Sequence, residues 1–413
     1  MERKVVVTGM GTVNPLGLTV DETWQSAVAG KSGVGPITLF DPSDLGARIA
    51  AEVKGFDPTQ VLEPREARRR DRYEQFAAVA VHQAMHQSGL IIDPASAGRV
   101  AVILSSAIGG LAAIENAIHT LTDEGPRRLG PFVIPMIMSN GASGMAAIDT
   151  GARGPSFSVA SACASSADGL GQAWLLLRSG VADAAIAGGA EATITRIGVA
   201  AFDRLGALSH RNEEYQLTPS PFDLNRDGLV MGEGAAVLIL ETLEHAQARG
   251  ATVLAELAGY GASADAFHVT APAEDGAGGA AAIRLALQSA EAGPDDVDYI
   301  NAHGTGTKLN DLSETLSVKA ALGERAYEVP ISSTKSMTGH MMGATGALEA
   351  IFCVQAIRTG MLPPTIHLAT PDPDCDLDYV PNQARQARVR LALSNAFGFG
   401  GHNAVLAFRS ISL

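Results

Sequence analysis

The sequence contains few charged, aromatic and cysteine residues. Charged residues make up 18% of the 413 positions and aromatic residues 5%, whereas hydrophobic residues make up 46%. A composition with so few charged and so many apolar residues excludes an intrinsically disordered protein. Its three cysteines, Cys163, Cys353 and Cys375, lie far apart and form no C-x-x-C pair. We therefore expect neither disulfides nor a structural zinc site, and a reducing, cytoplasmic setting.

Long apolar runs are also absent. Residues 181–190 are apolar, but the stretch is short and is interrupted by Asp183 and by glycines, so it is not expected to cross a bilayer. Residues 1–9 begin a strand and have neither the apolar region nor the cleavage site of an export signal. The formal net charge of −14 repels nucleic-acid phosphates at long range. We therefore expect neither a membrane nor a nucleic acid as partner.

Glycine, by contrast, is abundant, with 45 glycines among the 413 residues. The chain is longer than one hydrophobic core usually supports, so two domain-sized halves are expected. Buried strand patterns alternate with helix patterns that end at glycine, as in α/β proteins. Strands are predicted at residues 5–8 and 100–104, and helices at residues 21–30 and 72–89.

An approximate internal repeat indicates that the two halves are related. Residues 157–180 and 329–360 each run from a strand through a reactive-looking turn into a helix of small residues. Both helices carry apolar or small residues nearly all round, so we expect them to be buried centrally, with their N-termini at one shared pocket. The predicted halves are residues 1–250 and 251–413.

Cys163 stands where an apolar strand gives way to one of these helices. A thiol at the start of a helix lies beside free backbone N–H groups and the positive end of the helix dipole. Both favour the thiolate and would stabilise a developing oxyanion, which makes Cys163 a candidate nucleophile. Free cysteines are also often buried as small hydrophobic residues. The motif alone leaves both interpretations open.

Two histidines lie in glycine-rich turns at the ends of predicted strands. These turns are Asn-Ala-His303-Gly-Thr-Gly-Thr and Met-Thr-Gly-His340-Met-Met-Gly. Loops at strand ends are where α/β folds place function, so both are candidates for acid–base chemistry, the alternative being structural histidines. Zinc is a rival explanation, but neither has a second ligand at metal spacing. His82 and His86 lack the glutamate of a zinc-binding helix motif, and we assign them to a helix surface.

A further glycine-rich segment runs from Ser394 to His402. Its glycines permit positive φ, which predicts a flexible loop. Phe397 and Phe399 would act in this loop as apolar plugs, and the loop is therefore a candidate gate to a pocket. The alternative is a tight turn with two core phenylalanines, which suits Phe397 better than Phe399 between its glycines.

These motifs together resemble those of the β-ketoacyl-(acyl carrier protein) synthases, the condensing enzymes of the thiolase superfamily. The resemblance covers residues 1–410 and implies a five-layered αβαβα fold made of two similar halves, with the nucleophile helix buried between them. It rests on four segments in order: Ser161-Ala-Cys163-Ala-Ser, His303-Gly-Thr-Gly-Thr307 followed by Asp311 and Glu314, Lys335-Ser-Met-Thr-Gly-His340, and Asn395-Ala-Phe-Gly-Phe-Gly-Gly401.

The resemblance implies a ping-pong acyltransferase reaction. Cys163 takes an acyl group from its carrier protein, malonyl-carrier protein then enters and loses carbon dioxide, and the resulting carbanion attacks the thioester. By analogy, His303 and His340 assist decarboxylation and stabilise the enolate. The backbone N–H groups of Cys163 and Phe399 form the oxyanion hole. Lys335 orders the site, and its buried ammonium needs an acidic partner. The candidate partners are Asp311, Glu314 and Glu349.

Further positions match binding sites of the same family. We expect Thr305 and Thr307 to hydrogen-bond the phosphopantetheine arm of the carrier protein, and no other cofactor is required. The residues expected to line the acyl pocket are Ile108, Ala162, Gly198, Phe202 and Phe399. The positions that match a site for a monovalent cation, Na⁺ or K⁺, are Asn301, Glu349, Ser394 and Asn395.

Two basic patches stand out on this acidic chain, one of them in the arginine-rich segment that also contains Arg70 and Arg72. Because carrier proteins are acidic, we expect one to dock there, with charges at the rim raising the association rate. The alternative is a solvated helix in which the arginines pair with Glu66 and Asp71. The residues expected to dock the carrier protein are Arg65, Arg68, Arg69, Arg127 and Arg128.

The fatty-acid type II condensing enzyme is the closer resemblance, and it predicts chain elongation by a homodimer that associates through residues 105–160. Two segments, 303–311 and 371–379, look more like ketosynthases of type II polyketide or polyene systems. Such enzymes pair with a chain-length factor, so a heterodimer is the alternative. Acyl chain length, unsaturation and pathway are not encoded in these motifs.

Two further alternatives are disfavoured by particular residues. A non-catalytic chain-length or acyl-binding subunit would not need Cys163, His303 and His340 intact. A degradative thiolase uses a second cysteine as base near the C-terminus, where this chain has Ser394-Asn-Ala-Phe, and Cys375 lies in an acidic, proline-rich loop.

Overall fold

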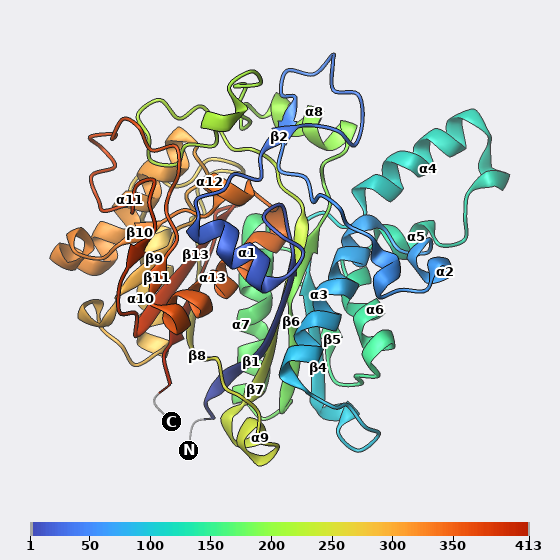
Figure 1. The fold of residues 1–413 in the computed structure, drawn as a ribbon, viewed down its shortest axis with the longest axis horizontal. Coiled ribbons are helices and arrows are strands. Elements are labelled where there is room, and N and C mark those ends of the chain that lie inside the picture. The colour runs from blue at the N-terminus through green and yellow to red at the C-terminus, as the bar shows by residue number, and fades with distance from the viewer. Residues whose placement is uncertain (1–2, 412–413) are drawn as a thin grey trace.

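The computed structural model of the protein describes residues 3–411 and is built around one mixed sheet of ten strands (Figure 1). In sheet order these are β10 (Ile331–Ser332), β9 (Tyr299–Asn301), β13 (Leu391–Gly398), β14 (His402–Arg409), β8 (Ala255–Ala264), β1 (Val5–Val13), β7 (Gly234–Thr242), β6 (Ala184–Glu191), β4 (Val100–Ser105) and β5 (Ser156–Phe157). Two short two-stranded sheets lie outside it, β2 (Gly35–Pro36) with β3 (Ile49–Ala50), and β11 (Met361–Leu362) with β12 (Arg385–Gln386).

The pairing pattern of the large sheet repeats. From β1 outward, β7 and β6 pair antiparallel, and β4 and β5 then pair parallel. From β8 outward, β14 and β13 pair antiparallel, and β9 and β10 then pair parallel. The two five-stranded sets join where Val6 and Val7 of β1 meet Glu256 and Ala255 of β8. The prediction of two similar halves is therefore confirmed, whereas their division at residue 250 stays a prediction.

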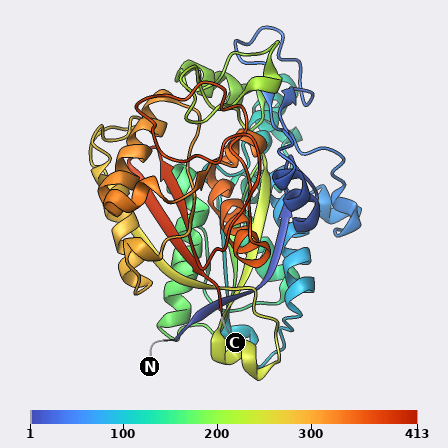
Figure 2. The same ribbon diagram turned by 60° about the vertical axis from the view of Figure 1, so that its left-hand side comes forward.

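Helices form three layers around these two sets of strands (Figures 1 and 2). The central layer is α7 (Ser165–Arg178) and α13 (Thr345–Thr359), which contact each other and strands of both sets. Outer layers are α3 (Arg72–Ser88) with α6 (Gly141–Thr150) on the first set, and α10 (Ala277–Ser289) with α11 (Lys308–Leu322) on the second. The predicted five-layered αβαβα fold is confirmed.

Small residues allow the central helices to pack closely. A Cβ on Gly171 of α7 would lie 2.5 Å from the Tyr260 ring, and one on Gly346 of α13 would lie 3.0 Å from Ala167 of α7. Every residue of α13 from Thr345 through Ala356 is buried. The prediction that these helices are central is therefore confirmed. A helix with apolar or small residues on all sides is stable only where other elements enclose it.

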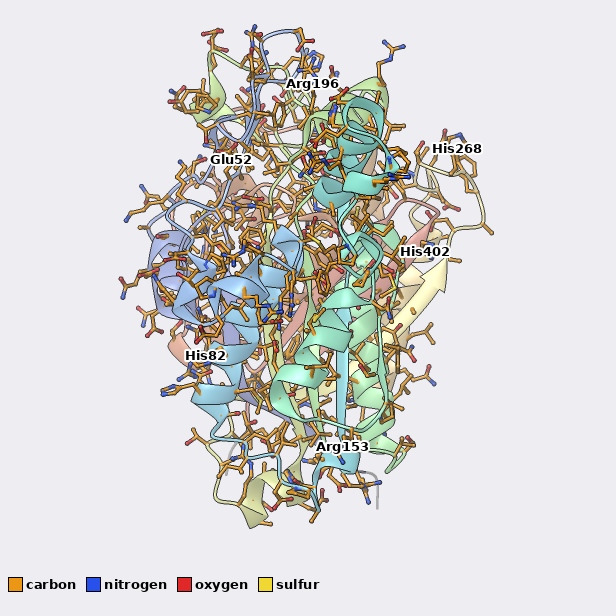
Figure 3. The ribbon with its side chains drawn as sticks, turned by 90° about the vertical axis from the view of Figure 1, so that its right-hand side faces the viewer. Glu52, His82, Arg153, Arg196, His268 and His402 are labelled. Atoms are coloured by element: carbon orange, nitrogen blue, oxygen red, sulfur yellow. The ribbon has the colours of Figure 1, made fainter. Side chains whose placement is uncertain are left out.

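The predicted strands and helices are observed, with one difference in β1. This strand continues through Gly9 and Gly11 to Val13. A Cβ on Gly11 would lie 2.0 Å from the Ala80 carbonyl oxygen of α3, so the glycines are needed for close packing of helix on strand. Helix α3 begins with a capping box of Asp71 and Glu74, and His82 lies on its exposed face, as predicted (Figure 3).

A helical arm projects from the body at the upper right of Figure 1. It consists of α4 (Leu111–Asp123) and α5 (Val133–Ile137) and exposes Ile118, Leu121 and Ile134. No helix within residues 3–411 is both long and apolar enough to cross a membrane. The remaining helices are α1 (Val20–Val28), α2 (Pro64–Ala67), α8 (Arg196–Arg204), α9 (Leu243–Ala248) and α12 (Lys335–Thr338).

Candidate active site

Cys163 lies in a 3-10 turn, Ala162–Ala164, immediately before α7, and only 8% of the residue is exposed. The backbone N–H groups of Phe399 and of Cys163 itself are directed at its sulfur. Burial nevertheless raises the pKa of the thiol to about 11, outweighing Lys335 and these N–H groups, which lower it. The N–H groups act in the direction expected of a helix N-terminus, but desolvation outweighs them in the resting site. Cys163 is a neutral thiol that needs a base.

Two imidazoles stand beside this thiol. The donor atoms of Cys163, His303 and His340 all lie within 4.8 Å of one another, and the two rings are nearly perpendicular with centroids 5.4 Å apart. Within residues 3–411, His303 Nδ1 and His340 Nε2 are buried without a hydrogen-bond partner. Burial, reinforced by the charge of Lys335, holds the pKa of both histidines well below the usual range. Both rings are neutral, so each can accept or donate a proton.

The turn that carries His303 is held by a carboxylate from the following helix. Glu314 of α11 accepts hydrogen bonds from the backbone N–H of His303 at 2.8 Å and of Gly304 at 2.7 Å, and from Asn395 Nδ2 at 3.1 Å. His340 is fixed differently, because its Nδ1 lies 3.0 Å from Thr345 Oγ1 at the start of α13. With Nδ1 engaged, the ring presents Nε2 as its unpartnered atom.

Of the three acidic partners considered for Lys335, the structure selects Glu349. Lys335 Nζ lies 2.5 Å from Glu349 Oε1, and both residues are 1% exposed. Glu314 is occupied by the His303 turn. Asp311 accepts hydrogen bonds from the backbone N–H groups of Phe222 and Gly306.

Arg226 was not identified from the sequence, yet it lines the same cavity and organises one wall of it. Its guanidinium donates to the carbonyl oxygens of Thr307 at 3.3 Å and Lys308 at 3.1 Å, and to Asp372 Oδ2 at 2.5 Å. It also lies 3.4 Å from Asp311 Oδ2. A single arginine in a loop carries no periodic signal. The available clue was the acidic segment 371–379, which supplies Asp372.

Cys163, both histidines and Arg226 line a cavity of about 370 Å³. The cavity extends from Cys163 to the exposed residues Lys308 and Leu309. Of the residues predicted to contact the carrier arm or the acyl chain, those that line it are Thr305, Thr307, Phe202 and Phe399. Ile108, Ala162 and Gly198 are not among its lining residues. Ile108 is 37% exposed on the loop after β4, and a Cβ on Gly198 would lie 2.2 Å from the Thr193 carbonyl oxygen. Their place in an acyl pocket stays a prediction.

Phe399 lies on the turn between β13 and β14, and a neighbouring loop holds that turn. The Gly400 N–H donates to the Val269 carbonyl oxygen at 2.8 Å, and the Asp265 N–H donates to the Gly401 carbonyl oxygen at 2.9 Å. The loop predicted from Ser394 to His402 is shorter than expected, because residues 394–398 pair with β14 as part of strand β13 and only residues 399–401 form the turn. In that turn Gly400 and Gly401 have φ values of 85° and 72°. Figure 3 shows His402 at this turn and His268 on the neighbouring loop. Phe397 packs against His303, with ring centroids 6.0 Å apart.

Two groups of donor atoms could hold a metal ion. The first is Cys163 with the two histidines, but the same Lys335 charge that lowers the histidine pKa values also repels a divalent cation. The second group consists of four of the oxygens that are buried without a hydrogen-bond partner in the described part of the chain. They are Asn301 Oδ1, Glu349 Oε2, Ser394 Oγ and Asn395 Oδ1, the four residues that were matched to a monovalent-cation site.

The site thus places a thiol, two neutral imidazoles and convergent N–H groups at the inner end of a cavity, which suits acyl transfer through a covalent thioester. Comparison with known proteins agrees. Residues 2–246 match the N-terminal domain of β-ketoacyl synthases, and residues 254–369 match the C-terminal domain.

Relatives and solved structures cover the full chain. A 3-oxoacyl-[acyl-carrier-protein] synthase 2 from Synechocystis sp. is 48% identical, over 99% of this chain and 98% of the relative. Among solved structures, the ishigamide ketosynthase/chain length factor has a TM-score of 0.93 at 37% identity. A type II polyketide ketosynthase, in complex with its acyl-carrier protein and bound to a hexaketide, has a TM-score of 0.92 at 36% identity. In both comparisons the match covers 100% of this chain and 100% of the solved chain. The chain belongs to the β-ketoacyl synthase family.

Proposed function

We propose that this protein is a 3-oxoacyl-[acyl-carrier-protein] synthase that condenses malonyl-carrier protein with an acyl chain bound to Cys163, in fatty-acid elongation. The observation that carries the proposal is the buried thiol within 4.8 Å of two neutral histidine nitrogens at the inner end of the cavity. The substrate carrier is the phosphopantetheine arm of an acyl carrier protein. The three cysteines of this protein, all within the described residues, are unpaired, which supports a cytoplasmic location.

In the first half-reaction the acyl group moves from the carrier thiol to Cys163. A neutral imidazole accepts the thiol proton as the sulfur attacks the acyl carbonyl, and the proton passes to the departing carrier thiolate. The oxyanion formed on the way accepts hydrogen bonds from the N–H groups of Cys163 and Phe399. The raised pKa of Cys163 makes this proton transfer necessary at neutral pH.

In the second half-reaction malonyl-carrier protein loses carbon dioxide. The C–C bond to the carboxylate breaks, and its electron pair forms an enolate whose oxygen accepts hydrogen bonds from His303 and His340. The enolate carbon then attacks the Cys163 thioester, and the new C–C bond forms as the C–S bond breaks. The sulfur leaves as a thiolate and takes a proton from solvent through a neighbouring imidazole. Lys335, paired with Glu349, adds positive charge beside both rings. Such a charge stabilises the negative charge as it moves from the malonyl carboxylate to the enolate oxygen.

Carrier-protein docking is proposed on one surface formed by both basic patches. Arg65 and Arg68 are exposed at α2, and Arg127 is exposed in the turn after α4. The Arg69 guanidinium lies 4.7 Å from the ring centroid of Phe132, which precedes α5 in the helical arm, so α2 and the arm are in contact. Arg128 is also exposed there and lies 3.8 Å from Glu124.

Arg70 and Arg72, which share the basic segment, are held by carboxylates of the fold instead. Arg70 is buried and forms two hydrogen bonds with Asp149, and Arg72 forms two with Glu233. The helix pattern alone could not separate these inward residues from the outward ones.

The double variant Arg68→Glu and Arg127→Glu is expected to raise the KM for acyl-carrier protein about tenfold at low salt, because reversed rim charges slow association. Its kcat should stay near the parent value, and the difference in KM should shrink as salt is added. Arg388→Glu reverses an exposed cation outside this surface and serves as control. An unchanged KM in the double variant, measured by steady-state kinetics, would refute docking here.

A monovalent cation, Na⁺ or K⁺, is proposed at the second donor group, which consists of Asn301, Glu349, Ser394 and Asn395. Lys335 pairs with one oxygen of Glu349, yet burial raises the pKa of this group to about 8, so its ionised form needs more countercharge than Lys335 supplies. Oxygen ligands with one negative charge suit a hard cation of low charge. The cation would supply that countercharge next to the Lys335 pair.

Potassium chloride is therefore expected to raise the unfolding temperature above that in choline chloride of equal ionic strength. At a concentration of 100 times the Kd, bound cation stabilises the folded state by about 2.7 kcal/mol. Ser394→Ala should reduce the difference between the two salts. Ser158→Ala, which removes another buried hydroxyl without a hydrogen-bond partner, should keep it. Equal unfolding temperatures in both salts would argue against the site.

A homodimer is proposed through residues 105–160. This segment contains the edge strand β5, which pairs only with β4 within residues 3–411, and the arm with exposed Ile118, Leu121 and Ile134. Unpaired strand edges and apolar patches are where a second copy of a chain adds. A heterodimer with a chain-length factor is the alternative, since solved relatives include a ketosynthase/chain length factor.

Purified protein with malonyl-carrier protein and acyl primers of graded length tests the function. The expected product is the primer extended by two carbons as its 3-oxoacyl-carrier protein, identified by mass spectrometry, from a homodimeric protein alone. Activity that appears only with a copurifying partner chain, and products extended several times without reduction, would favour the polyketide alternative. No condensation with any primer or partner would refute both.

A further inference from the structure

Glu191, the last residue of β6, is a completely buried acidic residue that the mechanism above does not use. Within residues 3–411, no lysine, arginine or histidine lies within ion-pair distance of it. Its two oxygens instead accept four hydrogen bonds. The donors are Ser106 Oγ at 2.6 Å, the Ala107 N–H at 2.8 Å, the Ile108 N–H at 3.3 Å and the Gly343 N–H at 3.0 Å.

The identity of these donors indicates the ionised form of Glu191. Three of the four are backbone N–H groups, which can only donate, so both carboxylate oxygens are required as acceptors. Burial raises the pKa of Glu191, while the same hydrogen bonds act to lower it. An ionised carboxylate accepts from all four donors, and the three backbone N–H groups favour this form.

The four donors come from opposite halves of the fold. Residues 106–108 follow β4 in the first half. Gly343 lies in the turn Met342–Ala344 of the second half, between His340 and α13. A Cβ on Gly343 would lie 2.4 Å from the Ala107 nitrogen and 2.7 Å from Glu191 Oε2, so only glycine allows this approach. The carboxylate is therefore the common acceptor at the junction of two loops that flank the nucleophile.

We propose that Glu191 is a positioning residue that clamps the loop 106–109 to the turn after His340, and so keeps His340 in reach of Cys163. This inference rests on the proposed role of Cys163 as the acyl acceptor. Glu191 does not line the cavity and would affect the proposed chemistry only by holding the two loops in place. A displacement of about 1 Å between the reacting groups lowers the reaction rate about 10²-fold.

The clamp and the charge of Glu191 have separable effects. Its negative charge disfavours the Cys163 thiolate and contributes to the raised pKa of that thiol. Glu191→Gln removes the charge, and the pH at which iodoacetamide half-maximally alkylates Cys163 is expected to move to lower pH. Glu191→Asp keeps the charge but withdraws the carboxylate by one methylene. It should keep the alkylation profile and lower acyl transfer to Cys163 about 10²-fold.

Glu241→Gln is the matched control, because Glu241 is equally buried at the far end of the neighbouring strand β7 and is bound by Arg249 and His245. It should lower the unfolding temperature without shifting the alkylation profile. If Glu191→Gln does not fold, Ser106→Ala removes one donor of the clamp and should slow acyl transfer at an unchanged profile.

Wild-type acyl transfer in Glu191→Asp and Ser106→Ala would overturn the clamp. An equal shift of the alkylation profile in Glu241→Gln would overturn it as well, because the shift would then report loss of any buried charge. Alkylation needs no carrier protein and can be measured even if the parent enzyme does not condense any substrate. If the alkylation profiles shift as expected but the parent shows no condensation, the proposed function is refuted and the clamp is not.

Discussion

Replacing Cys163 with alanine is expected to abolish acyl capture. After incubation with acyl-carrier protein, the parent should gain the mass of the acyl group and the variant should not. Condensation should fall by about 10⁴-fold or more, since among the described residues no second thiol lines the cavity. The fold should persist with a loss of about 1 kcal/mol or less in the free energy of unfolding, because the lost sulfur faces the cavity.

The same variant separates the two half-reactions. His303 and His340 remain in place, so decarboxylation of malonyl-carrier protein is expected to continue and to yield acetyl-carrier protein. Cys353→Ala is the control for acyl capture, because it removes another fully buried thiol, on α13, that does not line the cavity. Acylation of the Cys163→Ala variant at any residue, at a rate near that of the parent, would disprove the covalent mechanism.

The fold was predictable because its signals are local and repeated. The all-round small and apolar pattern of α7 and α13 identified the central layer, and the internal repeat anticipated the repeated strand pairing. The candidate nucleophile and both histidines were recognisable because each occupies a turn that leads into a helix. Cys163 and His303 follow strands, whereas His340 follows the short helix α12 and not the end of a strand. Such turns bring residues distant in sequence to one end of the sheet, as for Cys163 and His340.

Properties that depend on desolvation and side-chain direction were not predictable. The position of Cys163 before a helix suggested a lowered pKa, whereas burial raises it. Arg68 and Arg70 share one basic segment, yet only Arg70 faces inward. Glu191 and Arg226 stabilise loops through backbone atoms, and a sequence pattern does not encode which carbonyl or N–H group a side chain will reach.

Replacing Lys335 with methionine is expected to lower both stability and activity. The change leaves Glu349 buried without its ammonium partner, and breaking a buried ion pair in this way costs roughly 3–5 kcal/mol of unfolding free energy. It also removes a charge that lowers the pKa of His303 and His340, so both pKa values should rise. Because the reaction uses neutral rings, the acidic limb of the pH–kcat profile should move to higher pH. Chemical denaturation and steady-state kinetics measure the two effects.

The double variant Lys335→Met with Glu349→Gln distinguishes a structural role from a catalytic one. Neither buried charge is then left unpaired, so most of the lost unfolding free energy should return. The activity should not return, because the enolate and both imidazoles still lack the nearby positive charge, and the acidic limb should stay at the higher pH. If the double variant recovers activity together with stability, Lys335 acts only through folding. If the single variant unfolds like the parent, the pair contributes no stability. If its acidic limb does not move, the low pKa of the histidines comes from burial and not from the Lys335 charge.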